Sequence, residues 1–273
     1  MSTPPATRAL RASPIVALAG AAAFGLVLAR ALASEPPPLI TVAAVCGVFG
    51  VLALAAARYE LTIALGFLLL GAVRVEPAPS DALLAAVIAF AIATGRFDLR
   101  RVPSSMLALL VGLLALNLLS MTTAADLGDA LRFFAITLYL LTLAIWLATY
   151  LRSEERMRRV IGAYVAGAVV FAALAVLGLF VPYPGHDLLT GESATRAQGL
   201  FKDPNVFGPF LIPAALIMLE EALRPRLFGL RRAASVAVLA VLVLGIVFAY
   251  SRAAWLNFAV AIVVMLIVMS LRA

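Results

Sequence analysis

The sequence predicts an all-α polytopic membrane protein, with about ten transmembrane helices and with both chain ends in the cytoplasm. The 273 residues are 64% hydrophobic, whereas soluble domains are roughly half apolar. The apolar residues form runs of about 15 to 21, close to the length of a helical span across a bilayer. The runs do not alternate with period two, which argues against an outer-membrane barrel and leaves helices, which satisfy their own backbone groups in lipid.

Ten apolar runs predict the spans in order. They cover residues 14–33, 39–57, 61–75, 81–95, 105–121, 131–150, 160–180, 205–223, 233–250 and 253–271. The first run follows Arg8 and Arg11 like a signal peptide, but its length favours retention as a span. Pro-rich turns at Ser34–Pro38 and Glu76–Asp81 break the chain between spans. The third and fourth runs are short for a bilayer, which indicates segments that are tilted, re-entrant or merged differently, and the last case changes the number of spans by up to two.

The basic residues set the orientation. With the N-terminus inside, 15 of the 21 Lys and Arg residues fall in inside segments and six outside, as the positive-inside rule requires. The net charge of +7 therefore indicates topology, and we expect no nucleic-acid partner. The organisation predicted is a cytoplasmic tail (1–13), N-terminal transmembrane helices (14–150), and a region 151–273 with an outside loop at 181–204. The basic cluster Arg152–Arg159 is predicted to anchor the chain on anionic membrane lipids.

The outside loop ends in "TRAQGLFKDPNVFGPFL" (Thr195–Leu211), which predicts a capped helix start. Asp203 is a favoured N-cap residue, and Pro204 falls at the first helical position, where its missing N–H is harmless. Asn205 follows directly. A helix start presents free N–H groups and the positive end of a dipole, and both suit a phosphate.

Basic residues precede this helix start. Arg196 offers a planar fork that grips phosphate oxygens in pairs, and Lys202 offers a point charge. Gly199 permits a tight turn or a close approach to a ligand. The combination suits a diphosphate presented from the outer leaflet. The alternative is an ordinary capped helix with interfacial basic residues that snorkel.

A second motif, "YSRAAW" (Tyr250–Trp255), joins the last two predicted spans with almost no loop. Ser251 can cap the final helix, and Arg252 then lies at the positive end of that helix's dipole. A charge at this depth needs water, a carboxylate or an anionic ligand. The alternative is a snorkelling interfacial arginine.

The two motifs together resemble the O-antigen ligase/polymerase family. In that family of bacterial inner-membrane proteins an Arg, a Gly-Phe-like step and a Pro-Asn precede a membrane helix. A Ser-Arg-small-small-Trp then follows the next span. The motifs cover roughly residues 150–271, and the earlier spans match by hydropathy alone.

The resemblance implies a membrane glycosyltransferase that uses neither a nucleotide-sugar donor nor a metal or other cofactor. Such enzymes take a glycan from undecaprenyl diphosphate at the periplasmic face of the inner membrane. The acceptor is a lipid A core sugar, a growing polysaccharide or a protein hydroxyl. By motif match, Arg196, Arg252 and Lys202 are expected to bind the diphosphate, and their charge to stabilise the leaving group. The residues expected to shape the site are Gly199, Asp203, Pro204 and Asn205.

The resemblance does not assign a general base within this sequence. Family members continue into a large outer loop that carries a His taken to be this base, whereas this sequence ends at Ala273. We expect that C-terminal part to be missing here, in a fragment, a truncated gene product or a short relative that lacks the chemistry. His186, with Asp187 beside it, and Glu192 are the candidates to replace it.

Two other functions remain open from the sequence. A lipid-linked glycan flippase or transporter would need ionisable groups within its spans, but the charges lie almost entirely at predicted span ends. A non-catalytic membrane protein that binds the carrier lipid is the other alternative.

Overall fold

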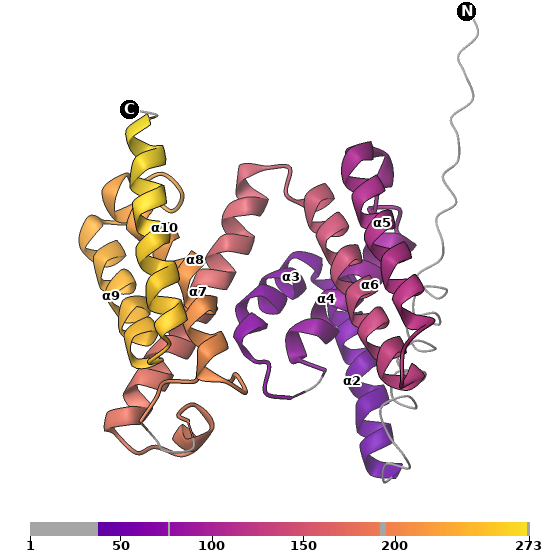
Figure 1. The fold of residues 1–273 in the computed structure, drawn as a ribbon, viewed down its shortest axis with the longest axis horizontal. Helices are drawn as coiled ribbons and strands as arrows, with labels where there is room; N and C mark the ends of the chain where they lie inside the picture. The colour runs from indigo at the N-terminus through magenta and orange to yellow at the C-terminus, as the bar shows by residue number, and fades with distance from the viewer. Residues whose placement is uncertain (1–37, 76, 192–194, 272–273) are drawn as a thin grey trace, which may run out of the picture. The chain divides into compact units, whose positions relative to one another are not determined.

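A computed structural model of the chain describes residues 38–75, 77–191 and 195–271, and its regular elements there are helices (Figure 1). The all-α prediction is confirmed for these residues. The α-helices described are α2 (Pro38–Ala57), α3 (Tyr59–Leu68), α4 (Pro79–Ala93), α5 (Ser104–Met121), α6 (Leu127–Tyr150), α7 (Glu154–Phe180), α8 (Pro204–Leu223), α9 (Arg232–Phe248) and α10 (Arg252–Leu271). Short 3-10 helices are η1 (Leu69–Gly71), η2 (Leu99–Arg101) and η3 (His186–Leu188). The predicted tail 1–13 and span 14–33 lie outside the described residues.

Helix length separates two classes of apolar helix. Within the described residues, five helices are long and apolar enough to cross a membrane: α5, α6, α7, α8 and α10. By contrast, α3 has 10 residues, α4 has 15 and α9 has 17. At 1.5 Å per residue, α3 rises only about 15 Å, half of the hydrocarbon thickness. The expectation that the third and fourth runs are short is therefore confirmed.

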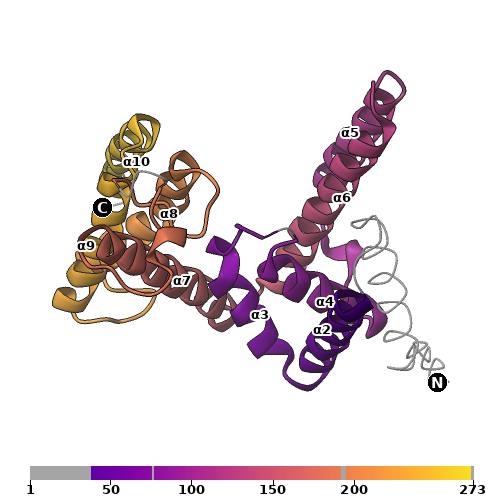
Figure 2. The ribbon, with the colours of Figure 1, turned by 90° about the horizontal axis from the view of Figure 1, so that it is seen from below.

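The chain divides into two compact units. Unit 1 comprises Met1–Ile63 and Ala82–Arg156, and unit 2 comprises Ala64–Asp81 and Met157–Ala273. In unit 1, a small core forms around Leu52, Ala55 and Ala86 of α2 and α4. Helices α5 and α6 form a long hairpin (Figure 2), and no residue of α5 is buried. Such an apolar and exposed surface suits contact with lipid.

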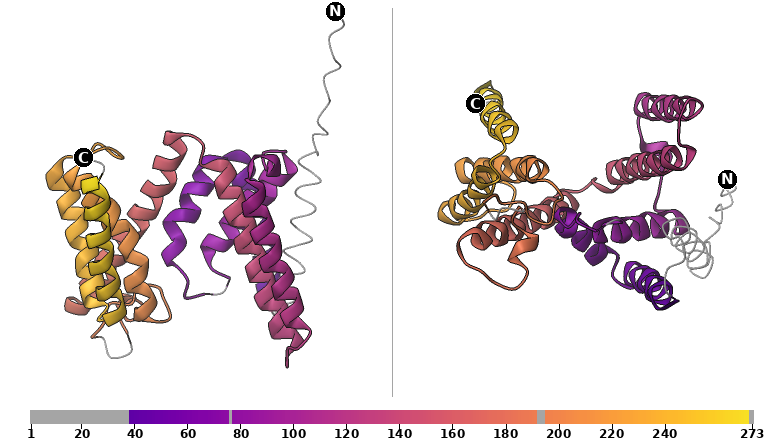
Figure 3. Two further views of the ribbon diagram at one scale, coloured as in Figure 1. Left: turned by 45° about the horizontal axis from the view of Figure 1, so that its top comes forward. Right: turned by 60° about the horizontal axis from the view of Figure 1, so that its bottom comes forward.

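Unit 2 packs α7 to α10 around one apolar core, with α8, α9 and α10 as neighbours (Figure 3). Small residues let these helices approach closely. A Cβ on Gly245 of α9 would come within 2.6 Å of Leu211 Cδ1 and 3.0 Å of Ala172 Cβ. A Cβ on Gly208 of α8 would come within 2.8 Å of Ala254 Cβ on α10. Unit 2 therefore holds α8, α9 and α10 in a fixed arrangement.

The carboxylate of Glu221 is buried at the end of unit 2 where α8 ends and α9 begins. Glu221 is 2% exposed, and its oxygens accept hydrogen bonds from four backbone N–H groups of the α8–α9 connection. The donors are Arg226 (3.1 Å), Leu227 (2.9 Å), Phe228 (3.2 Å) and Leu230 (3.1 Å). The carboxylate compensates for its burial by satisfying these donors, and it fixes the connection between the two helices.

Replacing this carboxylate is expected to destabilise unit 2. In Glu221→Gln an amide NH₂ takes the place of one acceptor oxygen, so two backbone donors lose their partner, a loss of about 1–3 kcal/mol. The thermal unfolding midpoint of the detergent-solubilised chain, measured by size-exclusion chromatography after heating, should fall. Glu220→Gln is the matched control, because the neighbouring Glu220 is exposed and should be neutral. Equal midpoints for the two variants would contradict this role for Glu221.

Candidate functional site

The candidate site lies at the end of unit 2 where α8 and α10 begin, the lower end in Figure 1. Asp203 Oδ1 accepts the backbone N–H of Asn205 at 2.7 Å, and Pro204 occupies the first turn of α8. Ser251 Oγ accepts the backbone N–H of Ala254 at 3.3 Å at the start of α10. Both helix starts predicted from the sequence are confirmed.

The two helix starts are neighbours. A Cβ on Gly208, in the second turn of α8, would lie 2.8 Å from Ala254 Cβ and 3.7 Å from Ser251 Cβ. Because both helices begin at this end, the positive ends of two helix dipoles face the same region. The first turn of each helix leaves backbone N–H groups without an intrahelical acceptor. The arrangement favours negative charge near these two starts.

Arg196 joins the two motifs, although they are about fifty residues apart. Its Nε and Nη2 donate to the carbonyl oxygen of Ala249 at 3.0 and 2.8 Å, and Nη2 also reaches the carbonyl of Tyr250 at 3.3 Å. Nη2 further donates to Asn205 Oδ1 at 3.0 Å. Beside it, the Ala197 N–H donates to the carbonyl of Phe248 at 2.8 Å. Arg196 therefore binds carbonyls that the end of α9 leaves without intrahelical donors.

Arg196 and Arg252 differ in their exposure and in the hydrogen bonds that they make. The Arg196 side chain is half-buried, and in the described part of the chain its Nη1 is the guanidinium nitrogen that makes no hydrogen bond. Arg252 is exposed, and its side chain makes no hydrogen bond or ion pair with any described residue. Lys202 is also exposed. The sequence named all three as ligands of an anion, and the structure adds that Arg196 mainly holds the site together.

Two positive φ angles shape the loops. Gly199 has φ +60°, and a Cβ there would lie 2.7 Å from the Phe207 ring, so both conformation and space require glycine. Tyr250 has φ 48°, which is uncommon for a residue with a side chain and marks strain in the α9–α10 turn. Trp255 Nε1 donates to the carbonyl of Ile246 at 3.0 Å and ties α10 to α9 across this turn.

The candidate base His186 lies at the start of η3. Its Nδ1 is 2.9 Å from the carbonyl oxygen of Tyr183, and its Nε2 is 3.2 Å from Asp187 Oδ1. Nδ1 therefore faces a backbone carbonyl, and Nε2 faces the carboxylate of the neighbouring Asp187. The Asp187 side chain is 83% exposed, whereas that of His186 is 24% exposed. Glu192, the other candidate, lies outside the described residues.

The sequence did not predict the hydrogen bond that Arg74 makes with Leu188. Its Nη1 donates to the carbonyl of Leu188 at 3.1 Å, which connects the turn after η1 to the 181–204 loop. Both segments are predicted on the outside face, and this shared face was the sequence feature that was compatible with a contact between them. The sequence held no indication that this arginine would bind a backbone carbonyl 114 residues away.

Exchanging Arg196 for lysine is expected to loosen the α9–α10 turn. Lysine keeps the charge but lacks the planar fork that reaches Ala249, Tyr250 and Asn205 together. The thermal midpoint of the solubilised chain should fall without any ligand present. The same exchange at exposed Arg252 should leave the midpoint unchanged. A fall in both variants, or in neither, would contradict the division between a positioning and an exposed arginine.

Gly199→Ala is expected to disturb the loop before α8. The substitution forces a side chain into a left-handed conformation and against Phe207, so we expect faster cleavage of the 195–203 segment by trypsin at Lys202. Gly191→Ala is the matched control in the same loop, because a Cβ there meets its nearest atom at 3.5 Å, an ordinary contact. Equal cleavage rates in the two variants would argue against the constraint at Gly199.

No family model, curated protein or solved structure matches this chain. The resemblance to the O-antigen ligase/polymerase family therefore stays a prediction from the two motifs within residues 150–271 and from the hydropathy of the earlier spans.

Proposed function

We propose that the chain is an O-antigen ligase-like glycosyltransferase, or the N-terminal part of one, in the bacterial inner membrane. It transfers a glycan from undecaprenyl diphosphate to a lipid A core, a growing polysaccharide or a protein at the periplasmic face. The observation that carries this proposal is the set of hydrogen bonds from Arg196 to Ala249, Tyr250 and Asn205. These bonds bring together the two motifs on which the family resemblance depends.

The chemistry of the site supports an anionic leaving group. A glycosyl bond to a diphosphate breaks with negative charge developing on the diphosphate, and fixed positive groups stabilise that charge. Arg252 and Lys202 are exposed near the two helix starts, and the dipoles of α8 and α10 add partial positive charge. Arg196 then acts as a positioning residue, since most of its fork already binds protein oxygens.

Loop contacts agree with the way in which the proposed topology, ten spans with both ends inside, groups the loops by face. The Arg74 turn contacts the 181–204 loop through Leu188, and both segments belong to the predicted outside set. Within unit 1, the segments around Tyr59, Arg96 and Arg152 line one pocket, and all three belong to the predicted inside set. Each contact joins segments that the proposed topology assigns to the same face.

The decisive variant is Arg252→Ala. It is expected to slow release of undecaprenyl diphosphate from its glycan-linked form by about 100-fold, because it removes an exposed positive charge without disturbing the α9–α10 turn. The assay uses the full chain in vesicles supplied with the glycan-linked lipid and a membrane extract as acceptor. Arg132→Ala is the matched control, because Arg132 is an exposed arginine of the predicted outside set that lies in unit 1.

The outcomes separate the three functions. Transfer that depends on Arg252 and not on Arg132 supports the glycosyltransferase. Binding of undecaprenyl diphosphate that needs Arg252, with no release of product, identifies a non-catalytic binding protein instead. Movement of the intact glycan-linked lipid across the vesicle, without release, identifies a flippase. Unchanged transfer in Arg252→Ala would remove the role assigned to this residue.

A further inference from the structure

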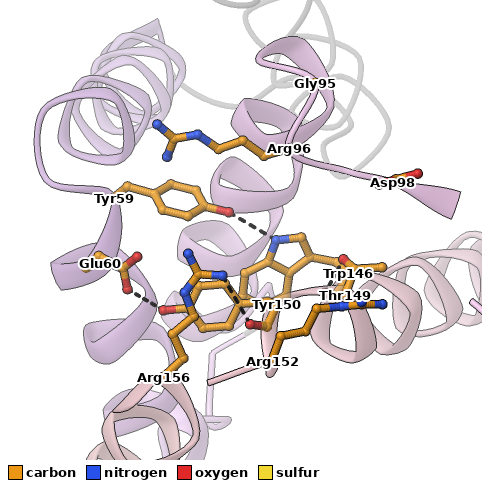
Figure 4. Close-up of a pocket in the computed structure, with 10 residues that line it drawn as sticks. All are labelled: Tyr59, Glu60, Gly95, Arg96, Asp98, Trp146, Thr149, Tyr150, Arg152 and Arg156. Carbon is orange, nitrogen blue, oxygen red and sulfur yellow. Dashed lines mark hydrogen bonds between the residues drawn. The ribbon is translucent and has the colours of Figure 1, made fainter. Parts of the chain in front are cut away.

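Unit 1 contains a pocket of about 420 Å³ that the proposed glycosyl transfer does not use. Ten residues line it: Tyr59, Glu60, Gly95, Arg96, Asp98, Trp146, Thr149, Tyr150, Arg152 and Arg156 (Figure 4). They come from the start of α3, the segment after α4, the end of α6 and the start of α7. The volume is within the range of small-molecule sites.

Aromatic side chains form a fixed wall of the pocket. The rings of Trp146 and Tyr150 are stacked with centroids 5.0 Å apart, and they are 1% and 5% exposed. Trp146 Nε1 donates to the Tyr59 hydroxyl at 3.1 Å, and the Tyr150 hydroxyl donates to Glu60 Oε2 (Figure 4). Buried rings with satisfied polar atoms change conformation little, so this wall is preorganised.

Two arginines lie over aromatic rings that line the pocket. The guanidinium carbon of Arg96 is 5.1 Å from the Tyr59 ring centroid, and that of Arg156 is 5.0 Å from the Tyr150 ring centroid. Arg156 Nη1 also donates to the carbonyl of Tyr150 at 3.4 Å. A guanidinium beside an aromatic ring has five N–H donors, and the ring contact uses none of them as a conventional hydrogen bond, so they can donate to an acceptor. Among the described residues, Arg96 makes ring contacts and its guanidinium donates no hydrogen bond.

The charge of the lining favours an anion. The lining contains three arginines and the two carboxylates of Glu60 and Asp98, which gives a formal net charge of +1. One carboxylate oxygen of Glu60 already accepts a hydrogen bond from the Tyr150 hydroxyl. Guanidinium forks match the oxygens of phosphate in paired hydrogen bonds, and a tetrahedral phosphate can accept from more than one fork. The pocket is larger than a phosphate needs, so an organic group can accompany it.

We propose that this pocket binds the phosphate group of a phosphate ester, held by Arg96 and Arg156. The same chemistry has two sources, a phospholipid headgroup at the membrane surface or a soluble phosphorylated metabolite. The site is separate from the outer candidate site, since every lining residue belongs to unit 1 and Arg196 and Arg252 belong to unit 2. The inference therefore does not depend on the proposed glycosyl transfer.

The test uses the full chain in a neutral detergent with two probes. Glycerol 3-phosphate is titrated by calorimetry, and binding of phosphatidylglycerol is measured by native mass spectrometry against phosphate-free diacylglycerol. We expect saturable binding of at least one phosphate probe. Arg96→Gln and Arg156→Gln should each weaken it about tenfold or more, the loss expected for a charge-assisted hydrogen bond.

Two matched controls locate the site. Arg100→Gln changes an exposed arginine in η2 that does not line the pocket, and Arg232→Gln changes an exposed arginine of the other unit. Both should bind the probe as the unchanged chain does. Binding of glycerol 3-phosphate identifies a soluble ligand, and binding of phosphatidylglycerol alone identifies a headgroup. Absence of saturable binding to both probes, or equal losses in the control variants, would overturn the proposal.

Discussion

The organisation of unit 2 depends on the hydrogen bonds between the Arg196 guanidinium and the carbonyls of Ala249 and Tyr250, directly after the end of α9. The end of an α-helix leaves carbonyl oxygens without donors, and leaving them unmet near lipid is unfavourable. Arg196 meets this need with one planar group, and Asn205 at the start of α8 accepts from the same nitrogen. One side chain thus sets the positions of the loop, the end of α9 and the start of α8. These hydrogen bonds also fix the turn that precedes the exposed Arg252, whose own side chain takes no part in them.

The helices could be predicted because their causes are local. Continuous apolar runs determine where helices lie in a membrane protein, and the described helices fall on the predicted runs from 39–57 onward. The starts of α8 and α10 followed from Asp203, Pro204 and Ser251, because capping acts over two or three residues. Each of these features can be seen in one short stretch of sequence.

The polar contacts of the site could not be predicted, because they join distant residues. Arg196 was expected to bind a ligand, yet the acceptors it meets are backbone carbonyls, and a carbonyl has no sequence signature. Glu221 has an ordinary neighbour in Glu220, and only the fold of the α8–α9 connection buries the first and exposes the second. The pocket of unit 1 draws on four separate segments of the chain. Hydropathy indicates that such segments share a face, but not that their side chains meet.

The geometry of the site depends on the number of residues in the short connection between α9 and α10. Only Ala249, Tyr250 and Ser251 separate the two helices, and they include the carbonyls that Arg196 binds. Each residue turns an α-helix by about 100°, so one residue inserted into the last turns of α9 would rotate those carbonyls away from the guanidinium. A whole-turn insertion would restore the rotation but shift the carbonyls by about 5.4 Å along the helix axis, so neither change keeps the geometry. Substitutions on the outer surface of α9 carry no such restriction, so sequences that keep this site can vary in composition while their α9–α10 segment keeps its length.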